Sequence, residues 1–433
     1  MLNPYHVRLI ESLRTIILSQ EFLERYRMAS NHFIRVRKLS FFSVIMLMLQ
    51  KSLKSLQLTL NELCKNLTHS ITASAYSQAR MKLNPEAFKH LLEHVRDFMY
   101  SEMPYKTYQG YILTAVDGSI IHIPNNKENI KHYGIISQTS KNIVHNSCPG
   151  SLMMCTYDVL NKVVLEANLN KCNTYEVSAF QELYNKKTCQ TQSPEIYILD
   201  RGFASYDFLC WLTLREKFIV RLSKSCFKEV SVAFDDALFT DKTLCVQRPG
   251  KSKRRNNPDI VNQLNLRIIR ILLENGTVEV LATNLTKKEM GTDFFKELYN
   301  FRWGIESFFK DIKELLTLEN FTGTTVQNIQ QDFWSTLFLA TFESCLRQDV
   351  DEKLQKKETM NQQKVNKAVS YNALKNNVFD LFISKTKTED ILKKLYSLFE
   401  TNPTQIRKKP SRPRIKSSTR TANHVKRRKK YIF

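Results

Sequence analysis

Four residues in one short segment carry side chains that suit work on a phosphate backbone: Tyr299, Arg302, Glu306 and Lys313. They lie three, four and seven residues apart in YNFRWGIESFFKDIKELL. Because an α-helix turns once in about 3.6 residues, this spacing places all of them along one stripe of a predicted helix. A carboxylate flanked by phosphate-binding groups can hold a metal ion against the backbone of a nucleic acid.

Two further carboxylates lie upstream in settings that suit the same chemistry. Asp117 lies inside the strand-like run YILTAVDGSIIHIP, and Asp200 ends the run EIYILD, just before the turn at Arg201 and Gly202. Carboxylates suit Mg²⁺, and two such ions about 3.5–4 Å apart can activate a nucleophile and stabilise the leaving oxygen. The sequence therefore predicts a two-metal site for phosphodiester chemistry, with Asp117, Asp200 and Glu306 as catalytic residues and metal ligands.

Each of these elements has an ordinary explanation when it is taken alone. Asp117 followed by Gly could form a turn, and Asp200 could cap the helix that follows it. Arg302 and Glu306 could be a surface ion pair of the common i, i+4 type. The complete spacing of the four residues is the sharper signal. In the metal-site interpretation, Arg302 binds a flanking phosphate through two parallel hydrogen bonds, and Lys313 binds one through its single compact charge.

The composition indicates a folded protein with a polyanionic partner. The chain has 433 residues, enough for two or three domains, and 42% of them are apolar. Its formal net charge is +23, of which twelve charges lie between 403 and 433, where no acidic residue occurs; the remainder carries +11. Such a charge predicts salt-dependent binding to phosphates, although a solubilising excess of charge is the alternative.

The cysteines and apolar runs indicate a cytoplasmic location. Nine cysteines show no CxxC pair, which is typical of a reducing compartment. The longest apolar run, FFSVIMLML, is too short to cross a bilayer. We therefore expect a cytoplasmic protein with no membrane contact.

Residues 1–105 are predicted to be helical and to form an N-terminal DNA-binding domain. A helix beginning near Thr72 carries polar Ser77, Gln78 and Arg80. With the short helix before it, this segment could form a helix-turn-helix, in which the second helix contacts DNA. A helical bundle with a solvated polar face explains the same residues.

Strands and helices alternate in the predicted catalytic domain, 106–320. The expected strands are 110–123, 151–158, 162–169, 195–200 and 217–222, and the expected helices are 175–187 and 203–215. This order predicts a mixed α/β sheet covered by helices. Residues from about 223 to 286 are predicted to be a β-rich insertion, with a type I′ hairpin turn at Asn275-Gly276.

Helices dominate the rest of the chain. The helix that carries Glu306 is expected from about 291 to 319. A helical C-terminal region, 321–402, follows as a candidate for dimerisation, with helices expected at 325–348, 360–384 and 388–400. The basic tail, 403–433, is expected to lack fixed structure when alone.

These segments resemble the DDE transposases of bacterial insertion sequences, specifically the insertion-sequence-four group. The group is marked by Tyr-x2-Arg-x3-Glu-x6-Lys, matched here by Tyr299, Arg302, Glu306 and Lys313. Its other blocks resemble AVDGSIIHIP around Asp117 and YILDRGFASYDFL around Asp200. The segments FRWGIESFFKDIKELLTLENFTG and SAYSQARMKLNPEAF are also similar, so the resemblance touches the N-terminal region and covers 106–320.

The resemblance implies an RNase H-like fold with a β-strand insertion between the second Asp and the Glu. It implies Mg²⁺, or Mn²⁺ in its place, at Asp117, Asp200 and Glu306. The family nicks DNA at the element end, forms and reopens a hairpin, and joins the 3′-hydroxyl to target DNA. The implied partners are double-stranded DNA, as terminal inverted repeats and as target, and a second copy of the chain in a homodimer. The candidate DNA-contacting residues are Tyr299, Arg302, Trp303, Lys310, Lys313, Arg201, Ser77, Gln78 and Arg80.

One departure from the family concerns the hairpin step, for which relatives stack a flipped base on Trp. The insertion has no Trp, and its aromatic residues are Phe227, Phe234 and Phe239. The nearest Trp in the sequence is Trp303, beside Arg302. Hairpin formation is therefore less firmly expected than cleavage.

Two rival functions remain open. A transposase-derived DNA-binding protein without catalysis would not need the three carboxylates, all of which are present. An RNase H-like nuclease without strand transfer would not need the basic N-terminal region and tail, which favour specific binding to DNA ends.

Overall fold

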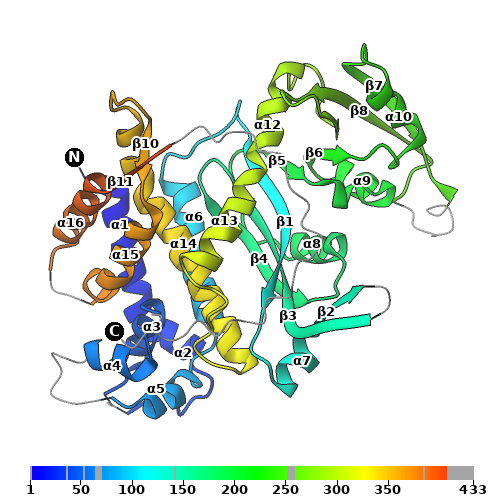
Figure 1. The fold of residues 1–433 in the computed structure, drawn as a ribbon. Coiled ribbons are helices and arrows are strands. Elements are labelled where there is room, and N and C mark those ends of the chain that lie inside the picture. The colour runs from blue at the N-terminus through cyan, green and yellow to red at the C-terminus, as the bar shows by residue number, and fades with distance from the viewer. Residues whose placement is uncertain are drawn as a thin grey trace.

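A mixed sheet of nine strands forms the centre of the protein (Figure 1). The computed structural model describes residues 2–35, 38–51, 54–63, 71–140, 143–250, 259–383 and 386–406. In the core the strand order is β4-β3-β1-β5-β6; β1 runs parallel to β5 and antiparallel to β3. These strands are β1 (Ile112–His122), β3 (Ile143–Asp158), β4 (Val163–Lys171), β5 (Glu195–Leu199) and β6 (Lys217–Leu222).

Helices cover both faces of this sheet. Neighbouring residues of a strand point to opposite faces, so each strand contributes side chains to both layers of packing. Ala115 of β1 packs into a core shared with the N- and C-terminal helices, whereas Val116 packs into a second core under α8 and α9. Figure 1 shows α8 on one side of β1 and the helices α6, α13 and α14 on the other. The helices named here are α6 (Glu86–Glu102), α8 (Glu176–Asn185), α9 (Tyr206–Thr213), α13 (Trp303–Glu314) and α14 (Val326–Gln355).

The terminal regions are helical, as predicted. The N-terminal helices are α1 (Pro4–Leu18), α2 (Gln20–Tyr26), α3 (Phe41–Leu49), α4 (Leu56–Leu63) and α5 (Ala73–Arg80), and the C-terminal ones after α14 are α15 (Lys367–Phe382) and α16 (Thr388–Thr401). Helix α14 is buried on nearly all sides, as expected for a helix at the centre of a packed core. The predicted mixed α/β core with a β-strand insertion and helical terminal regions is thus confirmed.

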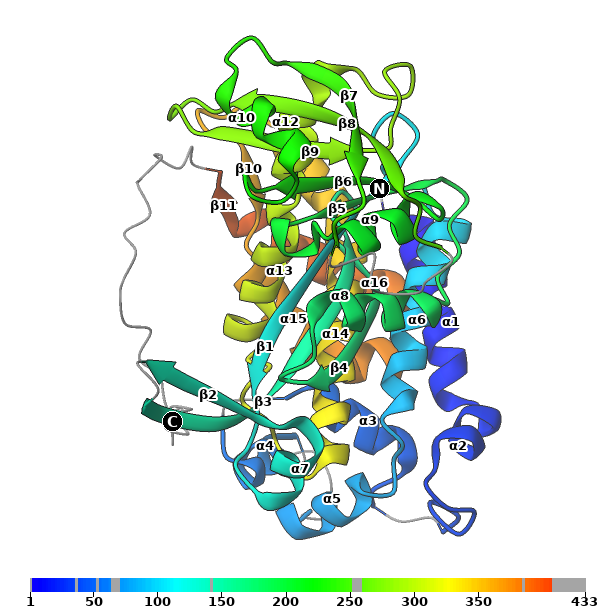
Figure 2. The same ribbon diagram turned by 90° about the vertical axis from the view of Figure 1, so that its right-hand side faces the viewer.

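Two short paired strands and the extended hairpin of β2 and the start of β3 complete the described backbone. The strand β10 (Gln363–Val365) pairs with β11 (Pro403–Gln405), so the first residues of the predicted tail are ordered by strand pairing. The remainder of that tail, 407–433, lies outside the described residues. Figure 2 shows β2 (Ile135–Ser140) and the start of β3 extending from the sheet with α7 (Lys127–Tyr133) at their base. Within the described ranges, no helix is long and apolar enough to cross a membrane.

The insertion continues the central sheet instead of forming a separate one. Its strands are β7 (Asp241–Gln247), β8 (Gln263–Leu272) and β9 (Val278–Thr283), and β9 pairs with β6 of the core. The hairpin between β8 and β9 lies where it was predicted, but its turn type differs. A type I′ turn needs positive φ at two residues, whereas only Gly276 of the pair Asn275-Gly276 has it, at 77°. Leu273 instead accepts a hydrogen bond from the Gly276 N–H, as in a type I turn that ends in a glycine bulge.

The N-terminal helices are tied to the core by Arg80, the last residue of α5. The Arg80 side chain is buried, and it donates hydrogen bonds to Gln331 Oε1 at 2.7 Å and Asp332 Oδ1 at 2.8 Å in α14. It also donates to the Asn328 carbonyl at 2.9 Å. The guanidinium is therefore committed to holding α5 against α14, and it is not presented to DNA as the predicted contact requires.

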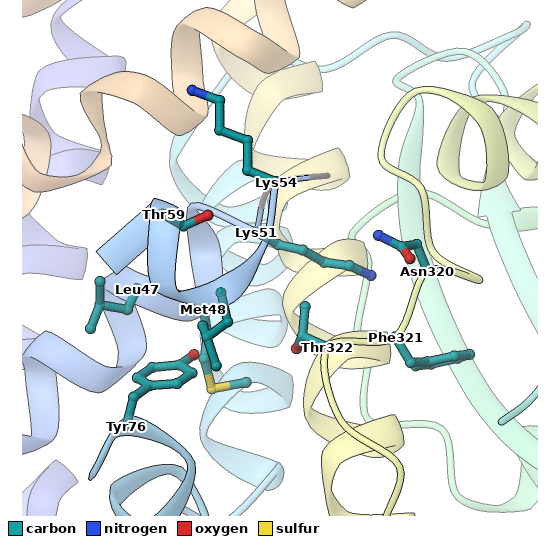
Figure 3. Close-up of a pocket in the computed structure, with 10 residues that line it drawn as sticks. Leu47, Met48, Lys51, Lys54, Thr59, Tyr76, Asn320, Phe321 and Thr322 are labelled. Carbon is teal, nitrogen blue, oxygen red and sulfur yellow. The ribbon is translucent and has the colours of Figure 1, made fainter. Parts of the chain in front are cut away.

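A second link between the same regions surrounds a small cavity of about 70 Å³ (Figure 3). Lys51 extends across it and donates hydrogen bonds to the carbonyls of Thr317 and Leu318, at 3.1 and 3.3 Å. Its ammonium lies 5.7 Å from the ring centroid of Phe321. Burial lowers the pKa of Lys51 to about 8. Because its ammonium is bound to the chain after α13, we assign Lys51 a structural role.

Replacing Arg80 by Ala is expected to lower the free energy of unfolding by about 3–5 kcal/mol, because it leaves the Asp332 charge buried without its partner. Urea unfolding followed by circular dichroism would measure the change. Ser77→Ala, on the exposed side of the same helix, is the matched control and should change stability by less than about 0.5 kcal/mol. Unchanged stability in Arg80→Ala, with weakened DNA binding, would contradict the structural role and restore the predicted DNA contact.

Candidate active site

Two of the predicted carboxylates lie at the same level of the central sheet. Val116 of β1 pairs in parallel with Leu199 of β5, and Asp117 and Asp200 are the next residues of the two strands. Neighbouring strands lie about 4.8 Å apart, so both carboxylates start from adjacent backbone positions. The strand β5 ends there, and the short helical turn η1 (Arg201–Phe203) carries the chain away. The parallel pairing of β1 with β5 therefore stops just before the two aspartates.

The predicted single helix from 291 to 319 is two helices with a break at Arg302. Helix α12 (Phe295–Phe301) ends there, α13 begins at Trp303, and α13 ends at Glu314 rather than near 319. At the break, the N–H of Arg302 donates to the Tyr299 carbonyl, which is the tighter bonding of a 3₁₀ turn. The expected stripe survives this break because a 3₁₀ turn changes the helical phase only slightly.

Arg302 binds the third predicted carboxylate. Its Nη2 donates to Glu306 Oε1 at 2.9 Å. Its guanidinium carbon lies 4.7 Å from the centroid of the Trp303 ring and 5.7 Å from that of Tyr299. Only 3% of Arg302 is exposed, and within the described part of the chain its Nε finds no hydrogen-bond partner. A buried guanidinium with a spare donor is suited to receive an anionic group such as phosphate.

Tyr299 and Lys313 hold the two helices against the strands that carry the aspartates. The Tyr299 hydroxyl donates to Asp200 Oδ1 at 3.3 Å. The Lys313 ammonium donates to Ser119 Oγ at 2.8 Å and to the Ile120 carbonyl at 2.6 Å, both in β1. Lys313 therefore anchors α13 to the strand of Asp117. The structure thus brings the predicted triad together with Tyr299, Arg302 and Lys313.

The electrostatics of the site are dominated by burial and by like charges. Burial raises the pKa of Asp117 to about 7; nearby Arg302 opposes this shift, and the carboxylates of Glu176 and Glu306 add to it. Burial also raises the pKa of Glu176, and Asp200 adds to that shift. Carboxylates that raise one another's pKa are close enough to benefit from a shared cation.

Glu176 lies beside this site, and the sequence analysis did not identify it. It is the first residue of α8, on the other face of β1 from α13. Its signal in the sequence is an acidic residue in the first turn of a helix, which is a common arrangement because it complements the helix dipole. The reach of its side chain to Gly118 and Gly202 depends on tertiary packing, which no local pattern reveals.

The other predicted DNA contacts differ in exposure. Arg201, Lys310, Ser77 and Gln78 are exposed, and Trp303 is 43% exposed. Phe227 and Phe239 of the insertion are buried in its core, and Phe234 packs partly buried against them. These three phenylalanines are thus part of the hydrophobic core, whereas Trp303 is exposed next to the triad.

The residues at this site fit a divalent cation by their chemistry. Among the described residues, no three His, Cys, Asp or Glu side chains already stand in the arrangement of a metal site. The carboxylate of Glu306 is instead bound to Arg302, whose positive charge also acts on Asp117 and Asp200. The cationic side chain of Arg302 thus interacts with all three carboxylates. Carboxylate oxygens of this kind are ligands that suit Mg²⁺ and Mn²⁺.

Comparison with known proteins places this geometry in context. Residues 108–342 match the family model described as a transposase DDE domain, a span that includes all three predicted carboxylates. The transposase InsG for insertion sequence element IS4, from Escherichia coli (strain K12), is 22% identical over 280 residues, which cover 62% of this chain and 59% of that protein. A cryo-EM structure of the piggyBac transposase synaptic complex with hairpin DNA aligns with a TM-score of 0.45 and 7% identity, covering 90% of this chain and 85% of that one.

Asp117→Asn is expected to stabilise the metal-free protein, with a gain that grows as the pH rises from about 4 to about 7. Below this window the carboxyl is protonated in both states, and above it the folded state holds an unfavourable charge that the unfolded state tolerates. The gain is at most about 4 kcal/mol, because each pH unit between the two pKa values is worth about 1.36 kcal/mol.

Urea unfolding with a chelator present, near pH 4.5 and near pH 8, would measure this dependence. Glu182→Gln, on the exposed face of α8, is the control and should show little change between the two conditions. The same stability difference for Asp117→Asn at both pH values would contradict the prediction.

Proposed function

Because its match to the family model spans more than half of its length, the chain belongs to the transposase DDE domain family, and we propose that it catalyses cut-and-paste transposition of an insertion sequence. The proposed reaction is metal-dependent cleavage at the element ends, followed by transfer of the 3′-hydroxyl into target DNA. The observation that carries this proposal is the convergence of Asp117, Asp200 and Glu306 around the buried Arg302.

Proteins of this family generally use a divalent metal ion. We propose Mg²⁺, replaceable by Mn²⁺, in a two-metal site held by Asp117, Asp200 and Glu306. When bound there, the ions supply activation of the attacking oxygen and stabilisation of charge on the leaving oxygen. The strands β1 and β5 hold the two aspartates in fixed register, so Glu306 is the ligand whose present bond, to Arg302, has to be exchanged.

Arg302 is the residue that can exchange one anion for another. Its guanidinium Nη2 binds Glu306 Oε1 at 2.9 Å, and its Nε has no acceptor among the described residues. A DNA phosphate at this position would take over the guanidinium and release Glu306 toward the two aspartates. Tyr299 would keep Asp200 in place by its hydrogen bond, and Lys313 would keep α13 on β1.

The remaining assignments follow from exposure and charge. We propose that Arg201, Trp303 and Lys310 contact DNA beside the site, because they are exposed next to its residues. Ser77 and Gln78 on α5 are proposed contacts of the N-terminal region, 1–105. The proposed division continues with the catalytic domain at 106–320, a dimerising helical region at 321–402 and a basic tail. The proposed active form is a homodimer on paired inverted repeats in the bacterial nucleoid.

Glu306→Gln is expected to reduce cleavage of the element's terminal DNA in Mg²⁺ by at least about a hundredfold, because a neutral amide cannot replace the carboxylate as a ligand. The products would be separated on denaturing gels as nicks, hairpins and joined strands. Glu314→Gln, exposed at the end of the same helix, is the matched control and should cleave like the unaltered chain.

Cleavage that survives Glu306→Gln would place the active site elsewhere. DNA binding without cleavage by the unaltered chain, in either Mg²⁺ or Mn²⁺, would instead favour a DNA-binding protein without catalysis. Cleavage without joined strands would favour a nuclease.

Removing residues 407–433 is expected to flatten the salt dependence of DNA binding while sparing cleavage at low salt. The segment carries twelve Lys or Arg and no acidic residue, and each phosphate contact adds about 0.9 to the slope of log affinity against log salt. Cutting after Ile406 leaves the pairing of β10 with β11 intact. Fluorescence anisotropy across a salt titration would measure the slope, and an unchanged slope would refute a role for the tail in binding.

A further inference from the structure

The carboxylate of Glu176 lies between β1 and the η1 turn. A Cβ atom built on Gly118 would be 2.9 Å from Glu176 Oε1, and one built on Gly202 would be 3.7 Å from Oε2. Gly118 directly follows Asp117, and Gly202 is the second residue after Asp200. The two oxygens of Glu176 are thus placed against the backbone beside both aspartates.

This placement requires a glycine at 118. Contacts between a Cβ and another heavy atom below 3.0 Å are essentially never found in proteins, so any side chain at 118 would displace the Glu176 carboxylate. The φ angle of Gly118 is not positive, and the strand would accept another residue on conformational grounds. The space for the carboxylate is therefore the feature that glycine provides here.

The Glu176 carboxylate has no partner that explains its position. Among the described residues it makes no hydrogen bond and no ion pair, although it is half-buried. Glu166 in β4 shows what a satisfied carboxylate looks like in this protein: it accepts hydrogen bonds from Arg96, from the Thr188 N–H and from the Cys189 N–H. A carboxylate withdrawn from water without donors is costly unless a cation completes its surroundings.

A favourable interaction with the N-terminus of α8 does not account for this arrangement. Such a role requires the carboxylate to lie over the free N–H groups of the first turn, where it would accept hydrogen bonds. The side chain instead points away from its own helix to the backbone of β1 and η1. The charge of Asp200 raises the pKa of Glu176, and Glu176 in turn raises that of Asp117, so these carboxylates repel one another.

We infer that Glu176 is a fourth carboxylate of the active site and binds a divalent cation together with Asp117 and Asp200. This inference rests on the proposed function, because it extends the same metal site to the helix α8. Binding draws Glu176 toward the cation from the α8 face, while Glu306 approaches from the α13 face after its release from Arg302. The site then has ligands from both layers of helices as well as from the sheet.

Binding of Mn²⁺ alone to the full chain tests the inference without relying on catalysis. The free ion would be titrated by electron paramagnetic resonance, for the unaltered chain, Glu176→Gln, Asp117→Asn and the control Glu182→Gln. Glu182 lies on the same helix with an exposed side chain paired to Lys186. Glu176→Gln is expected to raise the Mn²⁺ dissociation constant about tenfold or to remove one bound ion, whereas Glu182→Gln should bind like the unaltered chain.

A shift of less than about fivefold in Glu176→Gln, with no ion lost and with binding reduced in Asp117→Asn, would overturn the inference and leave the proposed function standing. Equal Mn²⁺ binding by the unaltered chain and Asp117→Asn, or no binding by either, would overturn the metal site itself and the inference with it.

Gly118→Ala provides a second, independent variant that retains every carboxylate. Its new methyl group would lie 2.9 Å from Glu176 Oε1 and 3.0 Å from Leu152 Cδ1, so the carboxylate, a flexible end, would be displaced and the Leu152 methyl group would shift by a few tenths of an ångström. It is expected to weaken Mn²⁺ binding about as much as Glu176→Gln does. Combining both changes should weaken binding no further, because each removes the same ligand. Additive losses in the double variant would overturn the inference, since the methyl group would then be acting on another part of the site.

Discussion

Repulsion between carboxylates gathered beside β1, where β5 ends, is the constraint on which the rest of this structure depends. Asp117 and Asp200 follow directly from paired residues of two parallel strands, and Glu306 and Glu176 approach from the two helical layers. Such a cluster is unfavourable unless positive charge is supplied. Arg302 supplies it from the break between α12 and α13.

The strands and helices around the carboxylates hold them together against their mutual repulsion. The long strand β3 supports β1 on one side and β5 supports it on the other, which fixes the position of Asp117. Helix α13 can approach these strands closely because Gly304 lies against Val159; a Cβ on Gly304 would be 3.1 Å from Val159 Cγ1. Lys313 then fastens the far end of α13 to β1. The acidic groups are thus carried by packed strands and helices, which fix their positions relative to one another.

Much of this arrangement was predictable, because the triad is carried by local patterns. Asp117 and Asp200 stand in or directly after apolar strand runs, and Glu306 shares a helical stripe with Tyr299 and Arg302. The missed features depend on contacts between distant segments. Arg80 has the spacing of a polar helix face, yet Asp332, 252 positions away, draws it into the core. The break at Arg302 follows from its buried bonds, and the reach of Glu176 follows from how α8 packs on β1.

The Arg80–Asp332 ion pair limits how the N-terminal helices can be exchanged between related proteins during evolution. A recombination event near residue 105 would bring α5 from one parent and α14 from the other. If the incoming α5 lacked the arginine, Asp332 would be left buried and charged; if the incoming α14 lacked the aspartate, the arginine would be stranded instead. Chimaeras joined at this point therefore fold stably only when both halves of this ion pair are inherited together.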